Sequence, residues 1–245
     1  MIAITRDISR SINACELTHL EPQTIDVTLA ELQHREYRNL LGALGLEVLR
    51  IPADDAYPDC VFIEDTAIVL DDLAVITRPG APSRRGETRA VADVLERHRP
   101  LVHIEAPATI DGGDVLVLDD RIYVGLSERT NEVAIAQLRY YTRREVIPVN
   151  VHGCLHLKSA ITRVSRDALL VNREWMDVTP FSDWTLIDVE EPFGANALLI
   201  GETVVYPNAF PRTLAKLRHL DVRTVDASEL AKAEGGVTCC SLILR

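Results

Sequence analysis

Short apolar runs rich in β-branched residues recur along the chain and predict β-strands. Several of these runs come in pairs that only two or three polar or turn-forming residues separate, which is typical of hairpins. Asp71-Asp72 separates one pair, Asp119-Asp120-Arg121 a second, and Gly201-Glu202 a third. The runs that we expect to form strands are Ile2–Thr5, Ala67–Leu70, Ala74–Thr77, Val115–Leu118, Ile122–Val124, Ala168–Val171, Ala197–Ile200, Thr203–Tyr206 and Ser241–Leu244.

Amphipathic segments with a helical period alternate with these hairpins. Between Thr28 and Leu44, apolar side chains fall on one stripe that we expect to be buried, namely Leu29, Leu32, Leu40, Leu41 and Leu44. Ser83 is the expected N-cap of a helix over Arg84–His98, with Glu87 placed to close a capping box.

Further helices are predicted in the second half of the chain. Thr130 is placed to cap a helix that runs to about Thr142. Pro211 stands where a first helical residue would and opens Arg212–His219, and Ser228 is the expected cap of a short final helix.

Two stretches of the chain repeat the same pattern. Glu64–Arg78 and Gly113–Gly125 both consist of a polar pair, a strand, an Asp-Asp turn and a second strand. Weaker copies begin near Ser159 and Asn196. A fifth begins near Cys239, and the N-terminal strand would complete it.

The spacing of these copies predicts an α/β fold in the form of a closed array. The copies start roughly 37–49 residues apart, which fits about five ββαβ-like units. A closed ring needs no capping repeats, so closure through the two termini is consistent with the pattern. No linker divides the chain, and we therefore expect one domain over residues 1–245. The alternative is an unsymmetrical fold, because hairpins and helices alternate in many α/β proteins.

Composition narrows the class of protein. Hydrophobic residues make up 47% and charged residues 26% of the chain, which excludes disorder as a description of the whole. The formal net charge is −11, which argues against a nucleic-acid partner because phosphate binding requires a basic surface. The acidic excess fits a cationic partner, or simple solubility.

The sequence indicates neither a membrane span nor an export signal. It has no apolar run of about 18 residues, and its N-terminus lacks an apolar signal core. We therefore expect a cytoplasmic protein whose 5 cysteines are reduced. Cys154 and His156 are the only metal-like pair, and two ligands do not make a zinc site. No role is assigned to Cys60 or Cys154, which are most simply packing residues.

Carboxylates, a histidine and a cysteine lie just before predicted strands, at equivalent positions of the repeats. In a closed ring, equivalent positions converge on the axis, so these side chains would share one central pocket. They are Glu64, Asp65, Asp111, Asp114, His156 and Cys239.

That set of groups points to nucleophilic attack on a cation. A thiol beside an imidazole is a nucleophile with a general acid or base, and Asp111 could orient the imidazole of His156. Surplus carboxylates are costly to desolvate unless a cation lies among them. A guanidinium is planar and bidentate toward carboxylates, so its carbon is the expected target of Cys239.

Each of these residues also has a structural interpretation. A lone cysteine such as Cys239 is more often a core residue. His156 could be a hydrogen-bonded core histidine, and Glu64-Asp65 a simple turn or cap. Their shared phase favours the functional interpretation without settling it.

Five motifs resemble those of the dimethylarginine dimethylaminohydrolase family and occur in the family's order. The resemblance as a whole extends from about residue 15 to the C-terminus. They are Pro58-Asp59-Cys60-Val61-Phe62-Ile63-Glu64-Asp65, the block Ile76–Glu87, Asp111-Gly112-Gly113-Asp114, Leu155-His156-Leu157-Lys158-Ser159, and Gly235-Gly236-Val237-Thr238-Cys239 with Ser241-Leu242. The family belongs to the guanidino-group-modifying (pentein) superfamily. Its fold is a five-bladed α/β propeller with pseudo-fivefold symmetry.

The resemblance implies hydrolysis of Nω-methylated L-arginine to L-citrulline and a methylamine, without metal or cofactor. It implies that Cys239 is the nucleophile, His156 the acid and base, and Asp111 the partner of His156. The residues expected to bind the small-molecule substrate are Leu17 in a lid loop, Asp59, Glu64 and Asp65 around the guanidinium, Arg84 and Arg129 at the α-carboxylate, and the Ala233 backbone. Relatives often form dimers, so a homodimer is possible.

Two departures from the family pattern leave alternatives open. A second cysteine, Cys240, follows Cys239, but the Gly-Gly-x-Thr-Cys frame points to Cys239 and strand alternation turns Cys240 away. The lid segment Ser11–Glu21 is less similar than the core motifs, so substrate preference stays open.

The rival functions lie in the same superfamily. An arginine deiminase carries Asp after His-Leu where this chain has Lys158, and an amidinotransferase is a further alternative. A non-catalytic propeller, such as the ribosome anti-association factor, would lack the complete set of polar residues.

Overall fold

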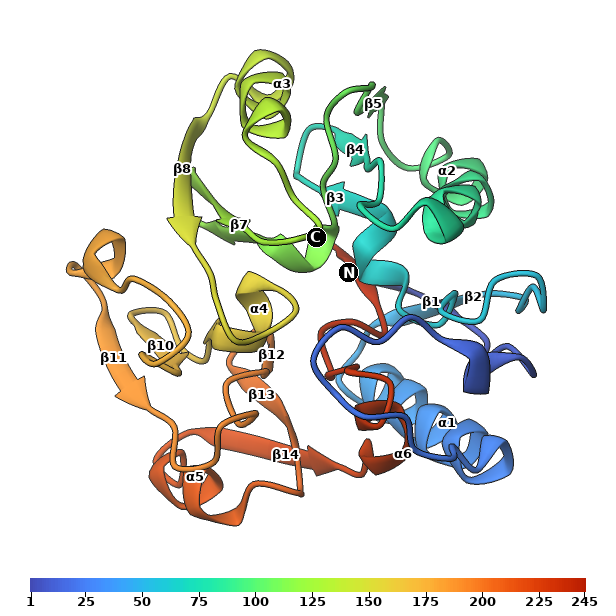
Figure 1. Ribbon diagram of the computed structural model, residues 1–245. Helices are drawn as coiled ribbons and strands as arrows, with labels where there is room; N and C mark the ends of the chain where they lie inside the picture. Colours follow the sequence, from blue (N-terminus) through green and yellow to red (C-terminus); the bar gives the residue numbers. More distant parts are fainter.

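A computed structural model describes residues 1–245 as five three-stranded sheets arranged around a central axis (Figure 1). The sheets are β15-β1-β2 (Leu242–Leu244, Ile2–Arg6, Glu47–Ile51), β3-β4-β5 (Ala67–Val69, Ala74–Ile76, Leu101–His103), β6-β7-β8 (Val115–Leu118, Arg121–Leu126, Glu145–Asn150), β9-β10-β11 (Ile161–Arg163, Ala168–Val171, Thr185–Asp188) and β12-β13-β14 (Leu198–Ile200, Thr203–Pro207, Asp221–Val225).

Every sheet has the same connectivity. Its first two strands are antiparallel, and its third strand runs parallel to the second. A helical segment connects the second strand to the third, because parallel neighbours need a crossover. The crossovers are α1 (Val27–Ala43), α2 (Thr88–Leu95), α3 (Glu132–Thr142), the 3-10 helix η5 (Thr179–Phe181) and α5 (Pro211–Lys216). This confirms the predicted ββαβ units of a five-bladed α/β propeller.

The two ends of the chain close the ring. β1 pairs with β15 in antiparallel register, with Ile2 opposite Leu244 and Ile4 opposite Leu242. Figure 1 shows both termini near the axis. The N-terminal strand therefore completes the fifth unit, as the repeat pattern predicted.

The remaining helical segments are short. They are α4 (Leu157–Ala160), α6 (Ser228–Ala231), η1 (Ile12–Ala14), η2 (Ile63–Thr66), η3 (Pro82–Glu87) and η4 (Gly112–Asp114). None of the helices combines the length and the apolar character that crossing a bilayer requires.

The strands that the hydrophobic pattern missed are mainly the outer ones. β2, β5, β8, β11 and β14 lie at sheet edges, and much of their surface is exposed. In β14, for example, Asp221, Arg223 and Thr224 are exposed and only Val225 is buried. Edge strands need no continuous apolar run, so they carry little strand signal.

The expected buried stripe of α1 was partly wrong. The buried face of α1 is formed by Ala30, Gln33, His34, Tyr37 and Leu41, whereas Leu29 and Leu32 are exposed. Gln33 is buried because its side chain bonds Ser228 and the Glu229 backbone.

The expected caps near α2 and α3 are engaged elsewhere. Ser83 donates a hydrogen bond to Glu16, and Glu87 pairs with Arg84 instead of closing a capping box. Thr130 donates to Asp114, and Asn131 caps α3. Long-range partners therefore displace the local capping patterns.

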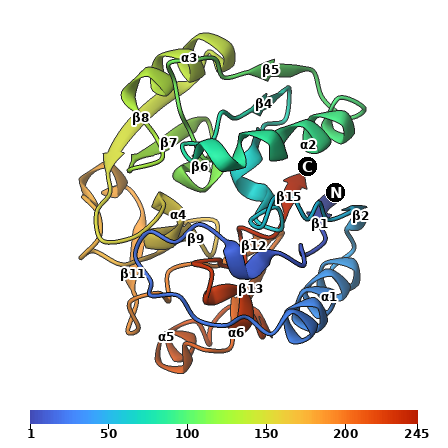
Figure 2. The same cartoon turned by 45° about the vertical axis from the view of Figure 1, so that its right-hand side comes forward.

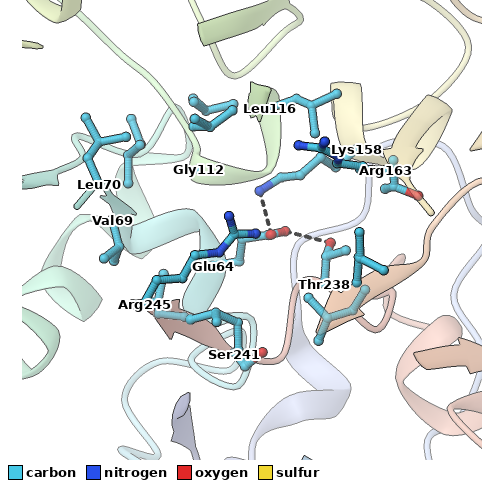
Figure 3. A pocket seen from close by; sticks show the side chains of 18 of the residues that line it. Glu64, Val69, Leu70, Gly112, Leu116, Lys158, Arg163, Thr238, Ser241 and Arg245 are labelled. Carbon is cyan, nitrogen blue, oxygen red and sulfur yellow. Dashed lines mark hydrogen bonds and ion pairs between the residues drawn. The ribbon is translucent and has the colours of Figure 1, made fainter. Parts of the chain in front are cut away.

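A cavity of about 460 Å³ follows the axis of the ring (Figure 3). Its walls come from β3, β6, β9, β12 and β15, the first strand of each sheet. Glu64, Gly112, Lys158 and Thr238, which directly precede or adjoin these strands, also line it. The polar residues before the strands therefore lie at one end of this axial cavity.

Candidate active site

The polar residues that share a phase in the repeats meet at the axis. Asp65 lies in η2 before β3, Asp111 directly precedes η4, His156 precedes α4, and Cys239 precedes β15. The backbone N–H of Glu64 donates to the carbonyl oxygen of Cys239 at 3.1 Å, which ties two of these segments together. Ring closure thus brings residues from distant parts of the chain into one site.

His156 lies buried between two carboxylates. Its Nε2 is 3.0 Å from Oδ2 of Asp111, and its Nδ1 is 3.7 Å from Oδ1 of Asp65. Burial favours the neutral imidazole, but Asp65, Asp111 and Asp114 outweigh it and raise the pKa of His156 to about 9. The imidazole is therefore protonated at neutral pH.

The backbone holds both carboxylates in place. Asp111 Oδ1 accepts the N–H of Gly80 at 2.9 Å, and Asp65 Oδ1 accepts the N–H of Gly113 at 2.9 Å. A Cβ atom at Gly113 would approach His156 Nδ1 to 2.5 Å and Asp65 Oδ1 to 2.8 Å. Only glycine lets the chain pass this close to both side chains.

The thiol of Cys239 lies at the same end of the axis. Its Sγ accepts a hydrogen bond from the N–H of Gly236 at 3.3 Å and makes none with His156. Burial, together with the negative charges of Glu64 and Asp65, raises the pKa of Cys239 to about 12. Without a cation in the site, the sulfur is therefore a neutral thiol.

The neighbouring cysteine faces a different environment. Cys240 is buried in the apolar cluster that contains Tyr37 and Leu41. Its thiol donates to the carbonyl oxygen of Gly236, and burial raises its pKa well above the ordinary value. Cys239 packs against the same cluster but is only half-buried, so it is the more accessible of the two thiols.

Glu64 belongs to a polar layer at the end of the axial cavity. Lys158 Nζ lies 2.5 Å from Glu64 Oε1, and Thr238 donates to Glu64 Oε2 at 2.8 Å (Figure 3). Asn196 donates to Thr238 Oγ1 and to the carbonyl oxygen of Lys158. Both oxygens of Glu64 thus have hydrogen-bond partners within the protein. Glu64 therefore connects the segments of Lys158 and Thr238 next to the site.

Arg84 also turns inward, away from the expected position at a substrate carboxylate. Its guanidinium donates to Asp65 Oδ2 at 2.7 Å and to both oxygens of Glu87. It also donates to the carbonyl oxygens of Asp59 and Phe62. These bonds fix Asp65. Burial opposes its charge, but His156 and then Arg84 outweigh burial and lower the pKa of Asp65 to about 2.

Asp59 and Arg129 face the segment that precedes α1. Asp59 accepts the N–H of Glu16 at 3.1 Å, and Arg129 donates to Thr18 Oγ1 at 3.1 Å. Arg129 also lies 3.9 Å from Asp111. Leu17 is half-buried in this segment, which passes α4 on its way to α1 (Figure 2).

The sequence motifs alone did not assign a role to Asp114. It is fully buried and accepts hydrogen bonds from Ser127, Thr130 and the N–H of Leu157. Burial raises its pKa to about 6. Because Leu157 directly follows His156, this carboxylate fixes the turn that carries the imidazole.

Asp65, Asp111 and His156 also offer ligand atoms within 4.8 Å of one another. These atoms are already engaged with Arg84, Gly113, Gly80 or one another. A metal ion at this place would have to displace the Arg84 guanidinium or backbone N–H donors from the carboxylate oxygens.

A five-bladed α/β propeller with cysteine, histidine and carboxylates at one end of its axis defines the pentein class of guanidino-modifying enzymes. Within that class, residues 5–181 match the family model of eukaryotic N,N dimethylarginine dimethylhydrolase. The chain belongs to the dimethylarginine dimethylaminohydrolase family.

Individual relatives agree with this assignment. The chain is 41% identical over 238 residues to the N(G),N(G)-dimethylarginine dimethylaminohydrolase of Streptomyces coelicolor, covering 94% of this chain and 91% of the relative. It is 35% identical to that of Pseudomonas aeruginosa over 226 residues, 89% of each chain. A solved structure of the Pseudomonas enzyme, a cysteine-to-serine mutant complexed with citrulline, superposes with a TM-score of 0.93 at 33% identity, covering 98% of this chain and 97% of that one.

Proposed function

We propose that the protein hydrolyses Nω-methylated L-arginine, as asymmetric dimethylarginine or monomethylarginine, to L-citrulline and a methylamine. The observation that carries this proposal is the buried, protonated His156 between Asp65 and Asp111, at the same end of the axis as Cys239. The citrulline complex of the Pseudomonas relative supports the same product.

The carboxylates orient the guanidinium. Asp65 and Asp111 present oxygens on either side of His156, and Asp59 lies nearby under the segment that contains Leu17. A planar cation among these oxygens forms charge-assisted hydrogen bonds with fixed geometry. Holding the carbon near the thiol supplies part of the rate through positioning.

The substrate itself activates the nucleophile. The pKa of Cys239 is about 12 because Glu64 and Asp65 add to the effect of burial. A bound guanidinium places positive charge beside the sulfur and lowers that pKa. The thiolate therefore forms mainly in the complex, which protects the free enzyme from alkylation and oxidation.

His156 handles the proton in both halves of the reaction. The thiolate of Cys239 adds to the guanidinium carbon, and His156 donates its proton to the departing methylamine as the C–N bond breaks. The S-alkylthiouronium that remains is attacked by water, one proton of which returns to His156. The C–S bond then breaks as the second water proton passes to solvent, which releases citrulline and the thiolate. Asp111 orients His156 throughout.

The amino-acid end of the substrate lies toward the lid. Arg129 can exchange its bond to the Thr18 hydroxyl for the substrate carboxylate, a contact that a planar guanidinium suits. The backbones of Leu17 and Ala233 flank this region in the proposed complex. Arg84 acts one step away from the substrate, because its bonds hold Asp65 and Glu87.

Product analysis tests the proposal. Asymmetric dimethylarginine, monomethylarginine and arginine are incubated side by side with the enzyme, and citrulline, dimethylamine, methylamine and ammonia are quantified. We expect citrulline with dimethylamine and methylamine from the methylated substrates. Faster release of ammonia from arginine would identify a deiminase instead.

Trapping tests the covalent step. A histidine-to-glycine variant of a relative forms an adduct with S-methyl-L-thiocitrulline. A thiolate is a better leaving group than an amine, so its departure needs no strong general acid. His156→Gly of this chain, treated with the same compound, should carry an adduct on the Cys239 peptide in mass spectrometry. An adduct on Cys240 alone would contradict the assignment.

A further inference from the structure

One carboxylate oxygen gathers three consecutive backbone donors of the lid. Glu234 Oε1 accepts the N–H groups of Thr18, His19 and Leu20 at 3.1, 2.5 and 2.7 Å. Successive N–H groups that converge on one point form a cradle for an anion. Here the anion is the side chain of Glu234, which lies 216 residues after Thr18 in the sequence.

The backbone of Glu234 is unusual for a glutamate. Its φ is +60°, in the left-handed region that side-chain-bearing residues seldom occupy. Its second oxygen, Oε2, is buried and has no hydrogen-bond partner. Both features cost folding free energy. Such features persist only where surrounding interactions hold them in place, which is common at functional sites. The three lid bonds are the interactions that compensate.

The segment that carries Glu234 also carries a contact of the nucleophile. Ala233 precedes it, and two residues later the N–H of Gly236 donates to Cys239 Sγ. A Cβ atom at Gly235 would meet Phe62 and Leu230, and one at Gly236 would meet Asn196. The segment therefore has little freedom to shift, and the position of Glu234 is set relative to the nucleophile.

Other side chains also attach the lid: Ser83 donates to Glu16 Oε1, and two further contacts involve proposed substrate ligands. Asp59 accepts the N–H of Glu16, and Arg129 donates to Thr18 Oγ1. In the proposed function, Asp59 turns to the guanidinium of the substrate and Arg129 to its amino-acid end. Glu234 would then hold Thr18–Leu20 without competing with substrate.

We propose that Glu234 is the positioning residue of the lid, and that its carboxylate holds Thr18–Leu20 over the site while Asp59 and Arg129 engage the substrate. The proposal rests on the proposed function for its effect on catalysis. It also explains how the lid shapes an adjoining pocket of about 310 Å³, since His19, Leu20, Glu234 and Gly236 all line that pocket.

The test compares Glu234→Ala and Glu234→Gln with Glu202→Gln, an exposed glutamate in the β12–β13 turn. Amide hydrogen exchange is measured first, without substrate. We expect exchange at Thr18, His19 and Leu20 to rise at least about tenfold in Glu234→Ala, because three charge-assisted bonds are lost. Glu234→Gln keeps the shape and an acceptor oxygen, so a smaller rise is expected, and Glu202→Gln should match the wild type.

Kinetics with asymmetric dimethylarginine form the second readout. A lid that is held less often in place should raise KM about tenfold while kcat changes less than about threefold. A general loss of structure would instead speed exchange throughout the ring and lower kcat.

The outcomes separate the two proposals. Unchanged lid exchange in Glu234→Ala, or a variant with faster exchange and an unaltered KM, would overturn the role of Glu234. Faster lid exchange in the variants, together with no hydrolysis of methylated arginines by the wild type, would uphold the structural attachment and refute the proposed function.

Discussion

His156 Nε2 and Asp111 Oδ2 lie 3.0 Å apart, and both side chains are almost completely buried. In this environment an isolated histidine would be neutral, because burial penalises the charged form. The surrounding carboxylates reverse that tendency and raise the pKa of His156 to about 9. The protonation state of this one ring underlies the first prediction.

Asp111→Asn should lower the pKa of His156. Below its pKa the histidine carries the proton that the leaving amine needs, so kcat/KM of the wild type should fall as the pH rises through about 9. Removing one negative partner favours the neutral ring, so that fall should move downward by roughly one pH unit. Turnover at pH 7 should decrease by about 10²- to 10⁴-fold, since His156 loses its orienting partner. The checks are a pH–rate profile and an NMR titration of His156.

The matched control for that experiment is Asp120→Asn, an exposed aspartate in the β6–β7 turn. It should leave the pKa of His156 and the turnover unchanged. An unaltered titration of His156 in Asp111→Asn would show that Asp111 does not set its charge.

Cys239→Ser should lower citrulline production by about 10³-fold or more, because a neutral hydroxyl is a far weaker nucleophile than a thiolate. The melting temperature should stay close to that of the wild type, since the substitution changes one atom. Cys240→Ala is the control and should remain active, because Cys240 packs in the apolar cluster behind the site. A fully active Cys239→Ser with an inactive Cys240→Ala would reverse the assignment.

Glu64→Gln should make the thiol of Cys239 more reactive in the free enzyme. Burial makes the largest contribution to the raised pKa of this thiol, and the negative charge of Glu64 makes the second largest. Removing that charge therefore lowers the pKa. In a Cys240→Ala background at pH 8, alkylation of Cys239 by iodoacetamide should accelerate by roughly three- to tenfold.

The control for alkylation is Glu47→Gln, an exposed residue of β2. It should leave the rate as in the parent protein. An equal or slower rate in Glu64→Gln would mean that the charge of Glu64 does not act on the sulfur.

Arg84→Met should destabilise the protein strongly. It removes the buried guanidinium that pairs with the carboxylates of Asp65 and Glu87, and breaking a buried ion pair in this way costs about 3–5 kcal/mol. Urea denaturation should show this decrease in the free energy of unfolding, whereas the exposed Arg89→Met should change it by less than about 0.5 kcal/mol. Adding Glu87→Gln to Arg84→Met should recover part of the loss. A loss as small as that of Arg89→Met would show that the pair does not support the fold.

Local patterns account for the inner part of the propeller. The hairpins at β3-β4, β6-β7 and β12-β13 follow from buried β-branched runs and turn residues, both of which act over a few positions. The outer strands escaped prediction because an exposed edge strand such as β14 carries charged residues where an inner strand is apolar.

The sequence also predicted which chemical groups form the site and that these groups meet at the axis. Asp111, His156 and Cys239 occupy equivalent positions in a repeat, and a closed repeat brings equivalent positions to its axis. The hydrogen-bond partners of these groups could not be inferred in the same way. Arg84 was expected at a substrate carboxylate, yet the folded chain surrounds it with Asp65 and Glu87, which satisfy most of its donors.

Residue order therefore specifies the units, their number and the reactive groups, because strand alternation, turn chemistry and repeat phase are local properties. Closure of the ring specifies which groups touch, and with that their charge states. The raised pKa of His156 requires three carboxylates from two other segments. The Glu234 contact uses backbone N–H donors, which every residue except proline has, so the residue types do not indicate it. Such interactions arise from proximity across the ring, which exists only after the first and last strands have paired.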